Sequence, residues 1–189
     1  RSPFVSAFLP RIIEDLRPRI AQIADELLDR AAGKNNMDLI ADYAFPLPVA
    51  VIGELFGVPT ADRPLLRRWA PDLVAALDMG ADSVAMERGA KAVRQFSSYL
   101  RNLIRLRRQT PQDDLISALV KGEDSDLSDE EMVANCILLL VAGHETTAHL
   151  IGNGTLALLQ NPEQWDLLRG GDATSQNAVE ELLRYDTSN

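Results

Sequence analysis

Cysteine is almost absent from this chain, which has only Cys136 among its 189 residues. One cysteine cannot form a disulfide within the chain, and its place inside an apolar run favours a buried structural thiol. The sequence contains no run of about 18 uncharged apolar residues, the length needed to cross a membrane, and its first residues do not form a signal peptide. These absences favour a protein of the reducing cytoplasm. Because the sequence opens with Arg1 and not Met, we expect it to be cut at its front.

Basic residues are also scarce, since 19 Lys and Arg stand against 28 Asp and Glu, giving a formal net charge of -9. Such a charge repels phosphate, so nucleic acid is not an expected partner. The only basic run comprises Arg101, Arg105, Arg107 and Arg108, at the end of a predicted helix. We interpret it as complementing the helix dipole and aiding solubility, in preference to docking an acidic partner.

Apolar residues recur at helical spacing through almost the whole chain, with Gly, Pro and Asn at the breaks. The length and the 46% hydrophobic content are typical of one globular domain with a substantial core. The segment 37–58 is dense in apolar residues, so we expect it to be fully buried. Predicted helices span residues 10–32, part of 37–58, 62–77, 83–108, 113–120, 129–159, 162–169 and 175–185.

The helix over 129–159 is the longest predicted element. The capping box of Ser128 and Glu131 marks its start, and Asn161-Pro162 ends it, with Asn161 capping the next helix. The hexapeptide Ala142-Gly143-His144-Glu145-Thr146-Thr147 interrupts its apolar sequence. Gly and Thr disfavour helix interiors and a buried carboxylate needs a partner, so roughly 1 to 3 kcal/mol of helix stability is given up. A local conflict of this kind is typical of a functional site.

Two other interpretations of the hexapeptide exist. It could be the solvent-facing flank of an amphipathic helix, with Thr146 and Thr147 bonded to preceding carbonyls and Glu145 hydrated. The apolar residues on every side of this helix argue against that flank and predict a helix buried from end to end. A zinc hydrolase is disfavoured, because His144 and His149 are five residues apart, whereas metal-binding histidines on one helical face lie four apart.

A second motif, Glu181-Leu182-Leu183-Arg184, lies in the last predicted helix. Its acid and base share one face, which by itself indicates only a solvated ion pair. In this order, however, the two motifs resemble those of a bacterial cytochrome P-450, in which an Ala/Gly-Gly-x-Asp/Glu-Thr-Thr/Ser sequence on a long central helix precedes a Glu-x-x-Arg helix. Other phrases, such as Asn161-Pro162-Glu163-Gln164, are also similar to bacterial members, so the resemblance covers essentially the whole chain.

The resemblance implies a mainly α fold, the helical core of the cytochrome P-450 fold, with haem b as cofactor. In the family the glycine leaves room for dioxygen, and the acid-threonine pair kinks the helix and relays protons. The implied catalytic residues are Glu145 and Thr146, the implied cofactor-binding residues are Ala142, Gly143, Thr147 and Arg1, and Glu181 and Arg184 are implied as a buried structural pair.

The family's β-rich part and its Phe-x-x-Gly-x-x-x-Cys-x-Gly loop, which supplies the haem ligand, are absent from this chain. Cys136 cannot replace that ligand, because it lies about two turns before Gly143 on the helix expected across the opposite face of the haem. No metal ligand is therefore assigned here. We expect residues 1–189 to be one helical domain fragment, with its oxygen-binding helix at about 129–159 and its Glu-x-x-Arg helix at about 176–185.

The resemblance further implies that the intact protein is a monooxygenase. It would insert one oxygen atom of O2 into a small organic substrate, with electrons from a ferredoxin-type or other redox partner. The alternative is a non-catalytic P-450-like auxiliary protein that acts by protein-protein binding, and a binding module on an unrelated helical fold is a further one. Retention of Gly143, Glu145 and Thr146 argues against the auxiliary protein, because a scaffold does not need a polar interruption in a helix.

Overall fold

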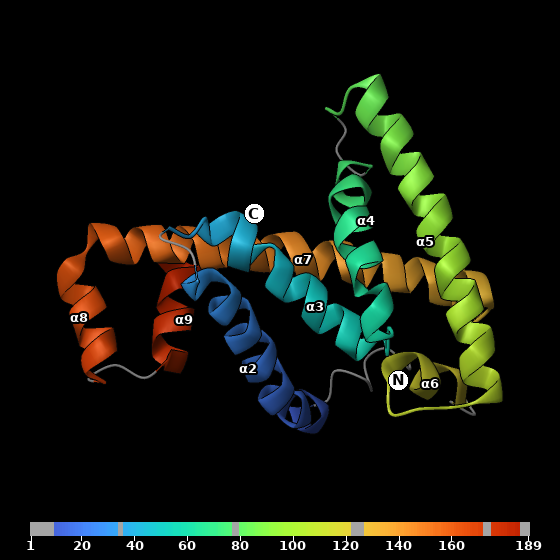
Figure 1. The fold of residues 1–189 in the computed structure, drawn as a ribbon, viewed down its shortest axis with the longest axis horizontal. Helices are drawn as coiled ribbons and strands as arrows, with labels where there is room; N and C mark the ends of the chain where they lie inside the picture. The colour runs from blue at the N-terminus through green and yellow to red at the C-terminus, as the bar shows by residue number, and fades with distance from the viewer. Residues whose placement is uncertain (1–9, 34–35, 77–79, 122–126, 172–174, 186–189) are drawn as a thin grey trace.

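The computed structural model describes residues 10–33, 36–76, 80–121, 127–171 and 175–185, and within these ranges every regular element is a helix (Figure 1). The mainly helical fold predicted from the sequence is thus confirmed. Arg1, an expected cofactor contact, lies outside the described residues. The elements are α2 (Pro10–Ala32), η1 (Ile40–Ala44), α3 (Pro46–Leu55), η2 (Thr60–Asp62), α4 (Arg63–Ala75), α5 (Ser83–Gln109), α6 (Leu115–Lys121), α7 (Asp129–Gln160), α8 (Pro162–Gly170) and α9 (Ser175–Tyr185).

Helix α7 runs across the whole arrangement and contacts α3, α4, α5, η1, α8 and α9 (Figure 1). The predicted capping box starts it. The Glu131 N–H donates to Ser128 Oγ at 3.3 Å, and the Ser128 N–H donates to Glu131 Oε2 at 2.8 Å. These two bonds satisfy backbone donors that a helix start otherwise leaves without partners.

The basic run at the end of α5 makes tertiary contacts that the sequence did not indicate. Arg101 pairs with Glu130 at 2.8 Å and Arg108 pairs with Asp129, so these two guanidinium groups hold the acidic first turn of α7 against α5. Arg107 is buried, with a side chain only 3% exposed. The prediction of a capping and solubility role is therefore wrong for Arg107, because the fold brings a carboxylate and a carbonyl to it from distant segments.

The main core lies where α3, α4, α5 and α6 meet α7. Its largest fully buried apolar side chains include Phe56, Leu66, Leu73, Phe96, Leu100, Ile104, Ile116, Leu119 and Leu140. Trp69 packs on Phe96 and Tyr99, with ring centroids 5.6 and 5.7 Å apart. Its indole N–H donates to Gln95 Oε1 at 3.1 Å, so this aromatic side chain is buried without losing its hydrogen bond.

The segment 37–58 is not fully buried, contrary to the prediction. Met37 is 36% and Ile40 is 41% exposed. The segment also forms two elements, because Pro46 has no N–H to continue a helix from η1. The Phe45 N–H closes the preceding turn instead by donating to the Ile40 carbonyl at 3.0 Å, five residues back, and α3 begins at Pro46.

The burial of α7 differs from the prediction. The helix is not buried from end to end, since Leu138, Leu156 and Leu159 are 59%, 56% and 64% exposed and no described helix covers them. Asn161 is the N-cap residue of α8, as predicted, but its side chain makes no hydrogen bond to the first turn of α8. Its Nδ2 donates to the Ala157 carbonyl at 2.8 Å and so closes the end of α7, while Pro162 opens α8 as predicted.

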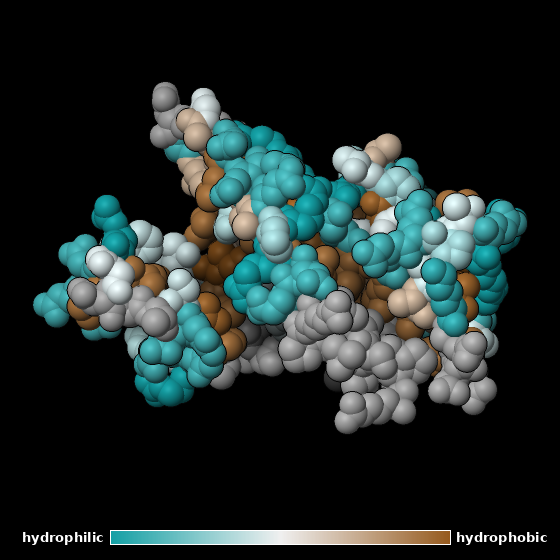
Figure 2. Space-filling view, turned by 90° about the horizontal axis from the view of Figure 1, so that it is seen from below, coloured by the Kyte–Doolittle hydropathy of each residue, from teal (hydrophilic) through white to brown (hydrophobic). Residues whose placement is uncertain are grey.

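Apolar side chains gather in the hollows of one face, between polar ridges, as Figure 2 shows. They do not form a membrane-crossing element, since none of the helices in the described ranges has both the length and the apolar content that a bilayer span requires.

Candidate functional site

The hexapeptide from Ala142 to Thr147 lies in the middle of α7, which stays a continuous α-helix through it. The helical rotation turns its side chains in different directions. Ala142 and Thr147 are exposed, His144 is buried, and Gly143, Glu145 and Thr146 are half-buried. The six residues therefore do not form one cluster but lie in separate environments around the helix.

Thr146 is held by its own helix. Its hydroxyl donates to the Ala142 carbonyl at 2.8 Å, one turn back. The solvent-facing interpretation of the motif predicted this bond for Thr146. The bond fixes the hydroxyl oxygen beside Ala142, with lone pairs left to accept a hydrogen bond from water or a ligand.

Glu145 reaches water directly, because its side chain is 41% exposed. His149 follows one turn later, 45% exposed, with Nε2 4.0 Å from Glu145 Oε1. The spacing of four residues between Glu145 and His149 was a sufficient signal for this pair, although His149 was interpreted only as a possible zinc ligand with His144. No group of three or more possible metal-ligating His, Cys, Asp or Glu side chains occurs among the described residues.

We call Leu138, Ala142, Glu145, Thr146 and His149 the open face of α7. Leu138 and Ala142, four residues apart, form an exposed apolar part, and the other three add a hydroxyl, a carboxylate and an imidazole within the next two turns. The open face therefore places side chains that can donate or accept hydrogen bonds immediately beside an uncovered apolar surface of the same helix.

An apolar cavity of about 500 Å³ brings together Ala142, Gly143 and Thr147, three of the expected cofactor contacts. Residues of α2 and α3 complete its lining, among them Ile20 and Ile52. A Cβ atom on Gly143 would lie 3.1 Å from Ile52 Cδ1, so the missing side chain lets α7 and α3 approach closely. Gly143 thus has a packing role that the sequence interpretation, based on room for dioxygen, did not foresee.

His144 is buried on another side of α7, with only 2% of its surface exposed. Its ring packs on Phe45, with centroids 5.1 Å apart, and Nδ1 has no hydrogen-bond partner among the described residues. Burial lowers the pKa of the imidazole, and the neighbouring His149 lowers it further, while a hydrogen bond to the Phe45 backbone raises it by less. The folded structure therefore favours a neutral His144.

This burial predicts a loss of stability in acid. His144 has an ordinary pKa of 6.5 in the unfolded chain and a lower one in the fold, so unfolding takes up a proton as the pH falls through the interval between them. The contribution of His144 is complete above about pH 6.5 and is lost progressively below it. Urea unfolding of the intact protein at about pH 7.5 and about pH 5.5 measures the difference.

We expect His144→Leu to show a smaller loss of stability between these pH values than the unsubstituted protein. His149→Gln is the matched control, because the chain has only two histidines and His149 is exposed. It should keep most of the acid-dependent loss, because burial, the larger cause of the lowered His144 pKa, is unchanged. The same pH dependence in all three proteins would contradict the assignment to His144.

Glu181 and Arg184 form the predicted pair in α9, with guanidinium-carboxylate distances of 2.8 and 2.6 Å. Their side chains are 57% and 72% exposed, so the expected burial is not observed among the described residues. The shared hydrogen bonds lower the pKa of Glu181 and raise that of Arg184. An exposed pair of this kind contributes little stability, and a role in holding a core together stays a prediction.

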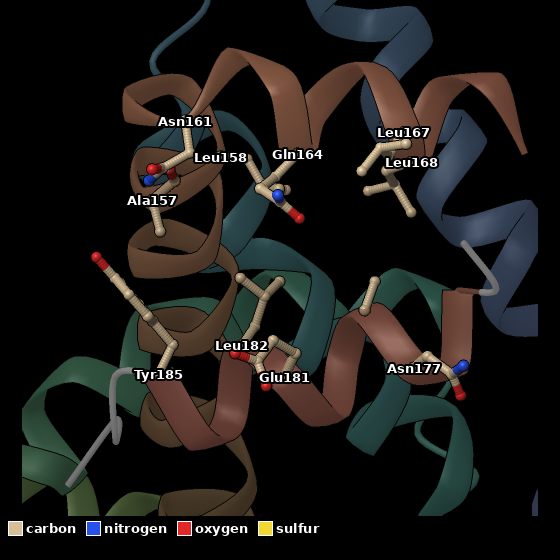
Figure 3. A pocket seen from close by; sticks show the side chains of 11 residues that line it. Ala157, Leu158, Asn161, Gln164, Leu167, Leu168, Asn177, Glu181, Leu182 and Tyr185 are labelled. Atoms are coloured by element: carbon tan, nitrogen blue, oxygen red, sulfur yellow. The ribbon is translucent and has the colours of Figure 1, made fainter. Parts of the chain in front are cut away.

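A second cavity, of about 310 Å³, lies between α8, α9 and the end of α7, and Glu181 belongs to its lining. Figure 3 shows the α8 and α9 side chains facing each other across it, with Leu167 and Leu168 on one side and Leu182 and Tyr185 on the other. The cavity does not reach Ala142 or Thr146, since none of the hexapeptide lines it.

Cys136 is a buried thiol, as the sequence predicted. Its side chain is inaccessible to solvent, and burial raises the pKa of its thiol to about 12. A protonated thiol inside the core is neither a nucleophile nor a metal ligand. Cys136 therefore takes no part in the open face of α7.

A buried polar cluster outside α7 was not foreseen. Arg107 donates from Nε to Asp114 Oδ2 at 2.5 Å and from a terminal nitrogen to the Gly57 carbonyl at 2.6 Å. Asp114 also accepts from the Ser117 N–H at 2.7 Å, which caps the first turn of α6. No local sequence signal joins Gly57 to Arg107, because fifty residues separate them.

Comparisons with known proteins agree with the resemblance in the motifs. A family model for Cytochrome P450 matches residues 67–169. Cytochrome P450 CYP107DY1 of Priestia megaterium is 48% identical over 182 residues, which are 95% of this chain and 43% of that protein. The Biotin biosynthesis cytochrome P450 of Bacillus subtilis is 43% identical over 182 residues, covering 96% of this chain and 46% of the relative.

The fold is similar to solved structures as well. The crystal structure of P450BioI in complex with an acyl carrier protein ligated to hexadec-9Z-enoic acid superposes with a TM-score of 0.88 at 44% identity. The superposition covers 96% of this chain and 47% of that chain. The chain thus spans less than half the length of these relatives.

Proposed function

Because the chain belongs to the cytochrome P450 family, we propose that it supplies the oxygen-facing helical part of a haem-thiolate monooxygenase. The intact enzyme would insert one oxygen atom of O2 into a small organic substrate, with electrons delivered by a redox partner. The observation that carries this proposal is the open face of α7, where the exposed Ala142 lies one turn from a fixed Thr146 hydroxyl.

The residues present fit a flat, largely apolar cofactor. Leu138 and Ala142 leave an apolar strip of α7 uncovered, and the small side chain of Ala142 lets a planar group approach the helix closely. The adjoining cavity beside Ala142, Gly143 and Thr147 is lined by apolar side chains of α2 and α3. Ala142, with Gly143 and Thr147 around this cavity, would hold haem by apolar contact, and bound haem supplies the activation of dioxygen.

Thr146 and Glu145 would handle protons at this surface. The Thr146 hydroxyl is oriented by its bond to the Ala142 carbonyl, so its oxygen can accept a hydrogen bond from a water molecule. Glu145 is exposed enough to exchange protons with solvent, and His149 lies one turn beyond it. The proposed route therefore runs from solvent through Glu145 to a water positioned by Thr146.

No described residue provides the axial thiolate, because Cys136 is buried and protonated. The proposal accordingly assigns this chain the side of the site that faces dioxygen and substrate. It does not assign a metal ligand to it. The family relationship supports a cysteine ligand elsewhere in the intact protein.

Ala142→Phe tests the proposed contact in the intact enzyme. A phenyl ring at this position would occupy the space next to the exposed strip, so we expect a several-fold loss of bound haem. We also expect loss of the red-shifted Soret band that a thiolate-ligated haem gives with carbon monoxide. Both are read by absorption spectroscopy on equal amounts of folded protein.

Ala134→Phe is the matched control, since Ala134 is exposed two turns earlier in the same helix. It should retain the haem and the spectrum. Equal haem content in both variants would contradict a contact at Ala142. A folded, unsubstituted protein that binds no haem would instead support the alternative, a non-catalytic auxiliary protein that acts by protein-protein binding.

A further inference from the structure

A third cavity, of about 210 Å³, lies among α2, α3 and the start of α4. It shares no lining residue with the apolar cavity beside Ala142. Its charged lining residues are Arg30, Arg63, Arg67 and Glu26, and the hydroxyl residue Thr60 adds a polar group at the rim. Three arginines therefore line one small cavity in a chain whose formal net charge is -9.

The nearby carboxylates are already shared among arginines. Glu54 accepts from Arg19 at 3.0 Å and from Arg63 at 2.6 Å. Glu26 lies 3.5 Å from Arg19 and 4.0 Å from Arg30. Two carboxylates are thus shared by three guanidinium groups, and Arg67 adds a fourth guanidinium group nearby.

Arg67 has no carboxylate partner among the described residues. Partial burial lowers the pKa of its guanidinium, and repulsion from Arg30 lowers it further. Arg63 also keeps a donor without an acceptor, because its buried Nε makes no hydrogen bond among the described residues. The cavity consequently combines an excess of positive charge with unused N–H donors, which is the electrostatic arrangement that an anion stabilises.

We propose that this cavity binds a phosphate group, either free or at the end of a small organic ester. Arg67, Arg63 and Arg30 would donate to its oxygens, and Thr60 would supply a hydroxyl. Planar guanidinium groups match phosphate oxygens in pairs. Arg19, Arg30, Arg63 and Arg67 carry two more positive charges than Glu26 and Glu54 carry negative ones, and a phosphate dianion would offset this excess. The volume corresponds to about seven waters, so it holds phosphate with room for the first atoms of an ester. The site is independent of the open face of α7.

Binding of inorganic phosphate and of glycerol 3-phosphate to the intact protein tests the proposal by calorimetric titration at constant ionic strength. Arg67→Gln should weaken binding about tenfold or more, the size expected for hydrogen bonds to a charged group. Arg68→Gln is the matched control, because Arg68 is exposed on the same helix and does not line the cavity. It should bind as the unsubstituted protein does. Tighter binding of the ester would identify an organic phosphate as the ligand, and equal or weaker binding would identify the free ion.

Thermal unfolding gives a second reading, since a ligand that binds only the folded state raises Tm. Phosphate should raise Tm above its value in chloride for the unsubstituted protein and for Arg68→Gln, but not for Arg67→Gln. Thr60→Val provides another test that keeps every charge, and it should weaken binding without changing Tm in chloride. Three results would overturn the proposal: no binding, equal binding by Arg67→Gln and Arg68→Gln, or an equal effect of acetate.

Discussion

Asp114→Ala is expected to lower the free energy of unfolding by about 3 to 5 kcal/mol, the cost of leaving a buried charge without its partner. Asp114 and Arg107 have side chains only 2% and 3% exposed, so water cannot replace the lost carboxylate. The substitution also removes the acceptor for the Ser117 N–H, which costs about 1 kcal/mol more as a lost helix cap. A domain's stability is typically about 5 to 15 kcal/mol, so much of it would be lost.

The pair matters because it joins three segments at one point. Arg107 belongs to the last turn of α5, Asp114 precedes α6, and the Gly57 carbonyl follows α3. Gly57 has a positive φ of 68°, and any Cβ there would collide with the Asp114 carboxylate. The turn after α3 therefore depends on glycine both for its backbone conformation and for the approach of Asp114.

Urea unfolding of the intact protein measures the effect, with Asp113→Ala as the matched control. Asp113 is the neighbouring acid and is exposed, so its loss should change stability by less than about 0.5 kcal/mol. Arg107→Met combined with Asp114→Ala should be less destabilised than the sum of the single changes, because no unpaired charge remains. Additive effects, or equal effects of the two aspartate substitutions, would show that the pair does not carry this energy.

Thr146→Ala is expected to uncouple oxygen consumption from product formation in the intact enzyme. Product formed per oxygen consumed should fall roughly 10- to 100-fold, the lower part of the range that a positioned proton-transfer group contributes. The physical reason is loss of the hydroxyl that the Ala142 carbonyl holds in place. Oxygen uptake and product yield, measured together under saturating substrate, give the ratio.

Thr146→Ser is the matched control, because it keeps a hydroxyl that can bond the same carbonyl. It should retain most of the coupling. Thr146→Ala should leave the urea midpoint almost unchanged, since the residue is half-buried and its bond lies within one helix. Unchanged coupling in a folded, haem-loaded Thr146→Ala enzyme would refute the proton-positioning role proposed for this residue.

The sequence predicted the helix ends well wherever the signal is local. Ser128 and Glu131 fix the start of α7 through bonds three residues apart, and Pro162 fixes the start of α8 because it lacks an N–H. The two motifs were sufficient to indicate the family, which the comparisons then confirmed. Residues Glu145 and Thr146 remain proposed catalytic groups.

Burial was predicted less well, because it depends on which segments meet. The apolar run in α7 predicted a helix covered on all sides, but Leu138 and Ala142 are exposed. Arg107 belongs to a basic run that looks solvated in the sequence, yet the fold closes Asp114 and Gly57 around it. The close approach of α3 likewise gave Gly143 a role that its neighbours in the sequence did not indicate.

The sequence by itself therefore determined the helical elements and the family, since capping, proline breaks and motif spacing act over a few residues. Only the tertiary structure decided which face of α7 is open, which charges are buried and where Arg67 lies without a carboxylate partner among the described residues. The physical reason is that burial and electrostatic pairing depend on distances between segments far apart in the chain, and these distances exist only after the helices have packed.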